Sequence, residues 1–211
     1  RTFSQTWYSN GALISISSGA LVHINGGAEL SQTSTVSNNG SVRITKNSTF
    51  PVPGTFTIGA NSSVGGNGAY FVEQDWINNG TFNAGTSTVT LFGNTQQFIT
   101  STNGISTVFS NLVFTGSGVG NNRKKTLQGV DASVNASGTL QLNDRELETQ
   151  TNTFFVLNPA VAAITFSNTF GSTIPQPKIS TQPLYLHIWH PSPLQMVQEI
   201  SISALGSVKG K

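Results

Sequence analysis

A glycine recurs at nearly constant spacing from Gly11 to Gly80. The marker glycines are Gly11, Gly26, Gly40, Gly54, Gly68 and Gly80. Five of them directly follow Asn, and Gly54 follows Pro53. Asn-Gly and Pro-Gly favour tight turns because Gly accepts a positive φ and Asn tolerates one. A turn repeated about every 14 residues predicts one short unit stacked many times, which is a solenoid.

Between the markers, apolar residues alternate with polar ones, as expected for strands. Since the usual step between markers is an even number, the inward face is kept from one unit to the next. We expect each unit to hold two short strands, such as residues 41–44 and 49–52. The side chains predicted to face inward are Ile14, Ile16, Val22, Ile24, Leu30, Val42, Ile44, Phe56, Ile58, Tyr70 and Val72.

The composition supports a β architecture covered by hydroxyl and amide side chains. Only 9% of the residues are charged, against about 25% in ordinary globular proteins. A hydrophobic fraction of 36% with 13 Phe argues against disorder. The sequence has no Cys, which excludes disulfides and thiolate metal sites, and no apolar run long enough to span a membrane.

The chain divides into three parts by sequence character. Residues 1–75 are predicted to form regular coils of about 14 residues each. Residues 76–172 hold longer, more aromatic β repeats that either continue the solenoid or form a small β domain. Five of the eight prolines lie between Pro175 and Pro193, so residues 173–211 are predicted to be an irregular tail or cap.

The few charged groups are interpreted as surface residues. Glu73 and Asp75, two apart, could share a strand face at a separation suited to glycoside hydrolysis, but we interpret them as a solvated pair beside Trp76 on an outer face. Asp144, Glu146 and Glu148 are interpreted as exposed loop and edge charges. The only basic run, Arg123-Lys124-Lys125, is expected to be a solvated loop, and nucleic acid is not an expected partner.

The remaining polar motifs also favour structural roles. His23 is expected to face outward, and the Pro-flanked His187 and His190 do not suit a helical metal pair. Gly65–Gly68 is interpreted as a turn and the Thr86, Thr88, Thr90 row as an exposed strand face. The pairs Asn38-Asn39, Asn78-Asn79 and Asn121-Asn122 could stack as an axial ladder at equivalent turns. We therefore predict no catalytic residue, no metal site and no cofactor.

Residues 9–166 carry a family resemblance. The stretches WINNGTFNAGTSTVTLFGNTQQFI, FSNLVF and NNRKKTLQGVDASVNASGTLQLNDRELETQTNTFFVLNPAVAAIT resemble repeats in large secreted surface proteins of the Bacteroidota. Such proteins are exported by type IX secretion and include adhesins, gliding-associated proteins and filament components. The family's usual Phe-Pro-Val-Gly-type segment is not found between Gly171 and Lys211, and EISISALGSVKGK only faintly echoes its C-terminal export signal. The resemblance supplies no catalytic residues.

These observations lead to one expected fold and two expected functions. The fold is an all-β solenoid, a right-handed parallel β-helix with a Pro-rich C-terminal tail. The first expected function is a structural or adhesive segment of a secreted or cell-surface bacterial protein, such as a stalk, fibre subunit or adhesin scaffold. The alternative is a carbohydrate-active β-helix module, either a polysaccharide lyase or a glycosidase.

The expected partners follow from the open ends of a solenoid. Unpaired strand edges and low charge favour contact with further copies or with the rest of a longer chain. A surface glycan or another cell-surface ligand is a further expected partner. Because the sequence starts at Arg1 without Met, we expect a fragment or processed product.

Overall fold

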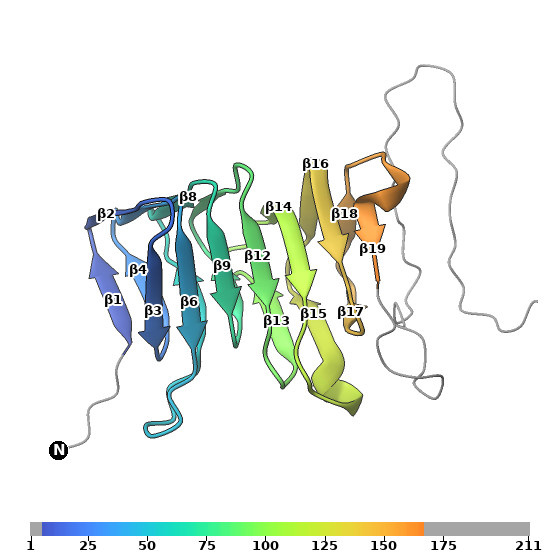
Figure 1. The fold of residues 1–211 in the computed structure, drawn as a ribbon, viewed down its shortest axis with the longest axis horizontal. Helices are drawn as coiled ribbons and strands as arrows, with labels where there is room; N and C mark the ends of the chain where they lie inside the picture. The colour runs from blue at the N-terminus through green and yellow to red at the C-terminus, as the bar shows by residue number, and fades with distance from the viewer. Residues whose placement is uncertain (1–5, 167–211) are drawn as a thin grey trace, which may run out of the picture.

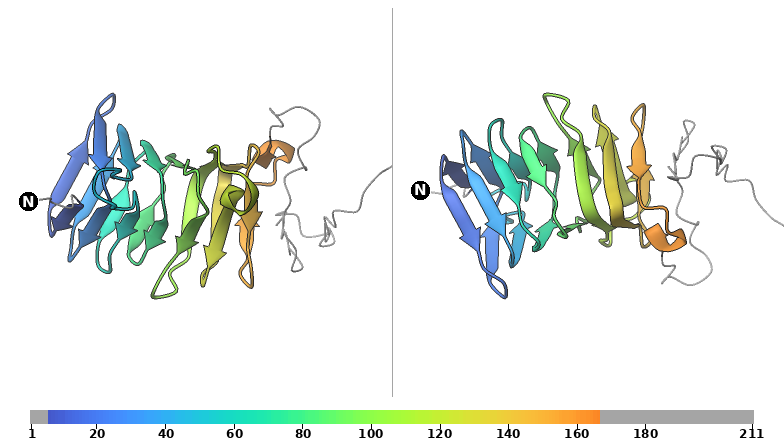
Figure 2. Two further views of the ribbon diagram at one scale, coloured as in Figure 1. Left: turned by 90° about the horizontal axis from the view of Figure 1, so that it is seen from below. Right: turned by 90° about the horizontal axis from the view of Figure 1, so that it is seen from above.

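The structure, a computed structural model, describes residues 6–166 and shows a parallel β-solenoid. The predicted Pro-rich tail at 173–211 lies outside the described residues. Figure 1 shows the coils following one another along the long axis of the molecule, and Figure 2 shows the same stack from two other sides. All pairs between named strands are parallel, and Asn47 and Val52 form one isolated antiparallel bridge. The predicted all-β solenoid is confirmed.

The strands form three sheets, which make the sides of the coils. Sheet A contains β1 (Trp7–Asn10), β4 (Ala28–Ser31), β7 (Phe56–Ile58), β10 (Trp76–Asn78), β13 (Gln97–Thr100), β15 (Lys124–Gln128) and β17 (Glu146–Glu148). Sheet B contains β2 (Leu13–Ile16), β5 (Thr35–Asn38), β8 (Ser63–Gly65) and β11 (Thr81–Asn83). Sheet C contains β3 (Leu21–Asn25), β6 (Ser41–Thr45), β9 (Ala69–Val72), β12 (Thr88–Leu91), β14 (Thr107–Phe114), β16 (Ala132–Gln141) and β18 (Phe154–Val156), and β19 (Ile164–Thr165) pairs with β16. Two short 3₁₀ turns, η1 (Gly120–Arg123) and η2 (Val161–Ala163), join strands in the last coils.

The predicted coil length, one step between marker glycines, is wrong. Each early coil contributes one strand to each sheet, so a full coil has three sides rather than two. Ala28 pairs with Phe56 of the next coil, 28 residues later, which is twice the usual 14-residue step between marker glycines. The later pair Ser63 and Thr81 is separated by only 18 residues of sequence. One glycine step is thus half of the coil between β4 and β7, whereas in the first coil Trp7 pairs with Ala28, only 21 residues later. The markers from Gly26 to Gly68 alternate between two of the corners.

The marker glycines are needed at the corners more for close packing than for turn conformation. Only Gly11 and Gly26 among them have a positive φ. A Cβ at Gly40, Gly68 or Gly80 would lie 2.4 Å from a backbone oxygen of the preceding coil. Since Cβ atoms do not approach backbone that closely, these positions must be Gly for the coils to stack.

The predicted inward face is confirmed. Of the eleven side chains expected inside, Ile14 and Val22 in the first coil are half-buried and the other nine are buried. Period two sends these side chains into one continuous core shared by all the coils.

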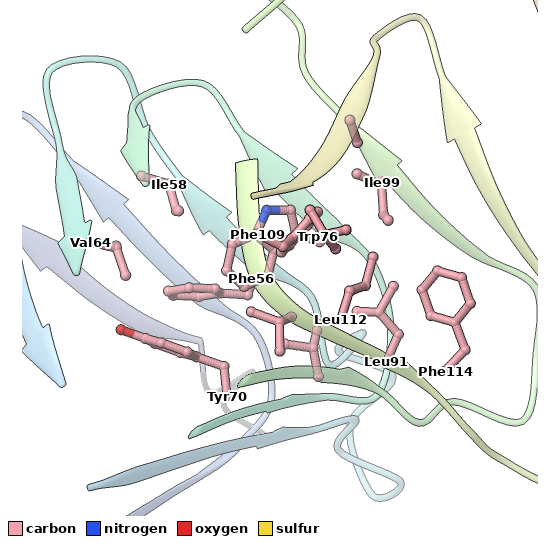
Figure 3. Packing of buried hydrophobic residues seen from close by; sticks show 14 of the residues in the cluster. Phe56, Ile58, Val64, Tyr70, Trp76, Leu91, Ile99, Phe109, Leu112 and Phe114 are labelled. Atoms are coloured by element: carbon pink, nitrogen blue, oxygen red, sulfur yellow. The ribbon is translucent and has the colours of Figure 1, made fainter. Parts of the chain in front are cut away.

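The middle of this core is aromatic. Trp76 is fully buried and packs edge-on against Phe56 and Phe82, with ring centroids 5.2 and 4.9 Å away. Figure 3 shows Trp76, Phe56, Tyr70 and Phe109 gathered with the aliphatic residues around them.

No break in sheets A and C separates residues 1–75 from those that follow, because both sheets run through this boundary. Sheet B ends at β11. From there the longer strands β14 and β16 turn the corner themselves, with a register shift between Phe109 and Asn111. The aromatic repeats therefore continue the solenoid as far as residue 166, one of the two arrangements expected for them.

Candidate functional site

The Glu73–Asp75 pair does not form a two-carboxylate site. Strand β9 ends at Val72, so both acids lie in the corner before β10. A Glu73 carboxylate oxygen accepts the backbone N–H of Lys46 at 2.9 Å, in the preceding coil. Asp75 accepts the N–H of Phe98 at 2.8 Å, in the following coil, and burial raises its pKa despite this bond. One carboxylate thus bonds to the preceding coil and the other to the following coil. The prediction of a freely solvated pair is wrong.

The acidic stretch 144–148 is also tied into the stack. The Glu148 carboxylate accepts from Lys124 at 2.6 Å and from the Thr126 hydroxyl at 2.9 Å. Burial alone would raise the pKa of Glu148, but these two bonds outweigh it and lower the pKa. Glu146 lies on the outer face of β17 and is half-buried. The expected exposed loop and edge charges are therefore wrong for Glu148, which joins two adjacent strands of sheet A.

Asp144 holds a buried arginine. Arg145 is 2% exposed, and its guanidinium donates to the Asp144 carboxylate at 2.9 and 2.5 Å and to the Gly118 carbonyl at 2.7 Å. The bond from Arg145 lowers the pKa of Asp144. Arg123 also donates, to the backbone oxygen of Asp144 at 2.9 Å. The charged groups in the corner before β17 are thus bonded to one another and to the backbone.

The basic run 123–125 is not a solvated loop. Arg123 ends η1, and Lys124 and Lys125 begin β15. Period two sends the two lysines to opposite faces, so Lys124 lies outside beside Glu148 and Lys125 lies inside, fully buried. The prediction is wrong because the run was considered as a set of charges, without the strand that contains it.

Lys125 is the centre of a buried polar group that the sequence analysis missed. It pairs in register with Gln97 of β13, which is fully buried too. The Lys125 ammonium contacts Gln97 Oε1 and donates to the Gly93 carbonyl at 3.1 Å. Burial, with a smaller effect from Arg145, lowers the pKa of Lys125 to about 7. The signal was the alternation Lys125, Thr126, Leu127, in which inward Leu127 implies an inward Lys125.

The predicted axial asparagine ladder is wrong. Asn38 ends β5 in sheet B and Asn78 ends β10 in sheet A, so they stand at different corners. Both are buried, and each accepts the N–H of the Gly two residues later, Gly40 at 3.0 Å and Gly80 at 3.2 Å. The third pair, residues 121–122, lies exposed in η1.

Side-chain acceptors at the corners link each coil to the next. Asn39 accepts the N–H of Asn67 at 3.1 Å, and Asn79 accepts the N–H of Thr102 at 2.7 Å. Four further side chains each accept the N–H of a residue in the following coil: Asn67, Asp75, Asn94 and Asp131. Asn and Asp thus replace backbone partners where the strands end.

The outer face of sheet C carries an exposed histidine and a stacked arginine. His23 faces outward as predicted, with Nε2 3.1 Å from the Thr45 hydroxyl. The Arg43 guanidinium lies 4.4 Å from the ring centroid of Phe92 and 5.8 Å from that of Phe71. The stacking holds Arg43 flat against the sheet.

The other motifs within the described residues lie in strands, corners and bends. Thr88 and Thr90 lie on the outer side of β12, where Thr88 is half-buried and Thr90 is buried, and Thr86 lies in the preceding corner. The prediction of one exposed row of threonines is therefore wrong. Gly65 ends β8, and residues 66–68, with a φ of 104° at Gly66, make the bend before β9, so the predicted turn is confirmed for residues 66–68. His187 and His190 lie outside the described residues.

Residues 6–166 hold neither a metal cluster nor a membrane-spanning helix. No three His, Asp or Glu side chains in this range lie close enough together to hold a metal ion. No helix in the same range is both long and apolar enough to cross a bilayer.

Comparison with known proteins gave no match. No family model, no curated protein and no solved structure is significantly similar to this chain.

Proposed function

We propose that this solenoid is a non-enzymatic structural or adhesive segment of a secreted or surface-exposed bacterial protein, acting as a stalk, fibre subunit or adhesin scaffold. The observation that carries the proposal is the use of the carboxylates. Glu73, Asp75 and Asp131 each accept a backbone N–H from an adjacent coil. Asp144 and Glu148 pair with Arg145 and Lys124. Four of these five carboxylates hold adjacent coils together, Asp144 holds its sequence neighbour Arg145, and the five are therefore not left to converge around a substrate.

The core supports a mechanical role. One hydrophobic cluster extends from Ile16 to Ala163 without a gap between coils. Backbone bonds between strands and side-chain bonds at the corners join every described coil to its neighbours. A rod built in this way resists bending because any bend must stretch a row of hydrogen bonds.

The location can be tested on cells of the organism that encodes the chain. Antibodies against the described solenoid should label intact cells or their medium, and a deletion strain should lose adhesion or its surface filaments. Label that appears only after permeabilisation would refute a surface role.

The carbohydrate-active alternative makes a different prediction. Purified chain incubated with neutral and acidic polysaccharides should release no new reducing ends and no unsaturated sugars. Turnover that is lost in Asp75→Asn but kept in Asp131→Asn would establish an enzyme and overturn the proposal. Asp131 is the matched control because it also accepts an N–H from the next coil, with Thr153 at 2.7 Å.

A further inference from the structure

The buried polar group inside sheet A brings an amine against a carboxamide. Gln97 of β13 and Lys125 of β15 are direct neighbours in the register, and both side chains are fully buried. The Lys125 nitrogen contacts Gln97 Oε1 and donates to the Gly93 carbonyl at 3.1 Å. Two adjacent coils are thus joined by reactive groups that water does not reach.

The Gln97 carboxamide is fixed at both ends. Its Oε1 accepts the Gly93 N–H at 2.7 Å, a contact that would stabilise negative charge developing on this oxygen. Its Nε2 donates to the Val72 carbonyl at 3.1 Å and also to the Gln74 carbonyl. The carbonyl carbon is therefore held in one place, with its oxygen polarised and its nitrogen positioned.

The Lys125 amine is suited to attack. Burial and the nearby Arg145 lower the pKa of Lys125 to about 7, so a large share of the amine is unprotonated near neutral pH. The charged groups facing it are Arg145, Asp144 and Asp75. Asp144 is paired with Arg145, whereas Asp75 has no cation paired with it among the described residues, and burial raises its pKa.

We propose that Lys125 and Gln97 form an intramolecular isopeptide bond. Lys125 Nζ attacks Gln97 Cδ, the Nζ–Cδ bond forms, the Cδ–Nε2 bond breaks, and ammonia leaves. A proton from the attacking amine goes to the departing nitrogen, with Asp75 as the relay. The reaction exchanges one amide for another and needs no oxidant, reductant or second substrate. Proximity supplies the rate, because folding makes the two groups neighbours before reaction.

The test is a peptide map of the full-length chain after folding and incubation at pH 8. A branched peptide should join Gln97 to Lys125, trypsin should fail to cleave after Lys125, and the intact mass should fall by one ammonia. Loss of ammonia alone does not support the bond, because Asn-Gly sequences such as Asn25-Gly26 also lose ammonia as they cyclise. Recovery of Gln97 and Lys125 on separate peptides from folded protein would overturn the proposal.

Variants separate the chemistry from folding. Lys124→Met removes the adjacent, outward lysine and should leave the branched peptide unchanged, whereas Lys125→Met should abolish it. Asp75→Asn should slow formation of the bond severalfold. The rate in the unmodified chain should rise between pH 6 and pH 8 as Lys125 loses its proton. A branch through Lys124, or a rate that does not change with pH, would refute the mechanism; the unmodified chain decides the outcome even if Lys125→Met fails to fold.

Discussion

Replacing Gly80 with Ala tests the close packing of the coils. A Cβ at this position would lie 2.4 Å from the Gly59 oxygen and 2.5 Å from the Ser62 oxygen. Both are backbone atoms, and neither can rotate away. The φ of Gly80 lies outside the left-handed region, so Ala can adopt the local conformation and any penalty comes from the neighbouring coil.

The magnitude follows from what must move. Opening the corner costs about 1–3 kcal/mol for overpacking. It also weakens the bonds from the Asn79 N–H to Ile58 O and from the Thr81 N–H to Ser62 O, 2.7 and 2.9 Å long, at about 1 kcal/mol each. We expect Gly80→Ala to lower the free energy of unfolding by about 3–5 kcal/mol.

Gly104→Ala is the matched control. Gly104 has a φ of 74° and open space where a Cβ would lie, so its replacement carries only the conformational cost of about 1–2 kcal/mol. Urea denaturation followed by circular dichroism gives both values from the shifts in midpoint. If Gly80→Ala costs no more than Gly104→Ala, the marker glycines serve turn conformation and the packing argument is wrong.

Four further outcomes are expected. Ile44→Asp, which puts a charge at a fully buried position, should lower the free energy of unfolding by several kcal/mol, whereas Arg43→Asp should cost about 1 kcal/mol from the lost stacking; equal losses would contradict the inward face. The pKa values of Asp144 and Glu148 are lowered in the folded chain. The stability that these two carboxylates contribute is therefore present above about pH 4 and is lost as the pH falls through their folded pKa values. Glu148→Gln should make the free energy of unfolding fall less steeply in this acid range. Sedimentation at micromolar concentration should show self-association, and a well-folded monomer with both ends covered would refute it. A chelator should leave the melting temperature unchanged within a few degrees, and a larger fall would reveal a metal.

Alternation along the strands could be predicted from the sequence, but the path between strands could not. Ile44 and Ile58 face inward because period two fixes the face of any strand. Coil length depends on the corners, where the long connection between β6 and β7 replaces the shorter ones found elsewhere, and no local rule sets its length. From Gly26 to Gly68 the evenly spaced glycines mark alternate corners, so the step between them is shorter than a full coil.

The polar residues show the same limit. Several acids find their partners in an adjacent coil rather than along the sequence, as Asp75 does with Phe98 and Glu148 with Lys124. Asp144 is the exception, because it pairs with the next residue, Arg145. Lys125 could have been placed inside from Leu127 alone. Its contact with Gln97 depends on the register between β13 and β15, which becomes visible only when the coils are stacked.

The side-chain acceptors at the corners are distributed unequally between the two directions along the stack. Six of these side chains, among them Asn39 and Asn79, belong to the earlier coil and receive an N–H from the later one, whereas Ser34 and Glu73 accept from the coil before them. A coil that has already formed therefore presents acceptors to the segment that follows it along the chain. A coil that is added after a folded coil finds more of these acceptors in place than a coil that is added before one. We expect this arrangement to favour folding from the N-terminal coil onward.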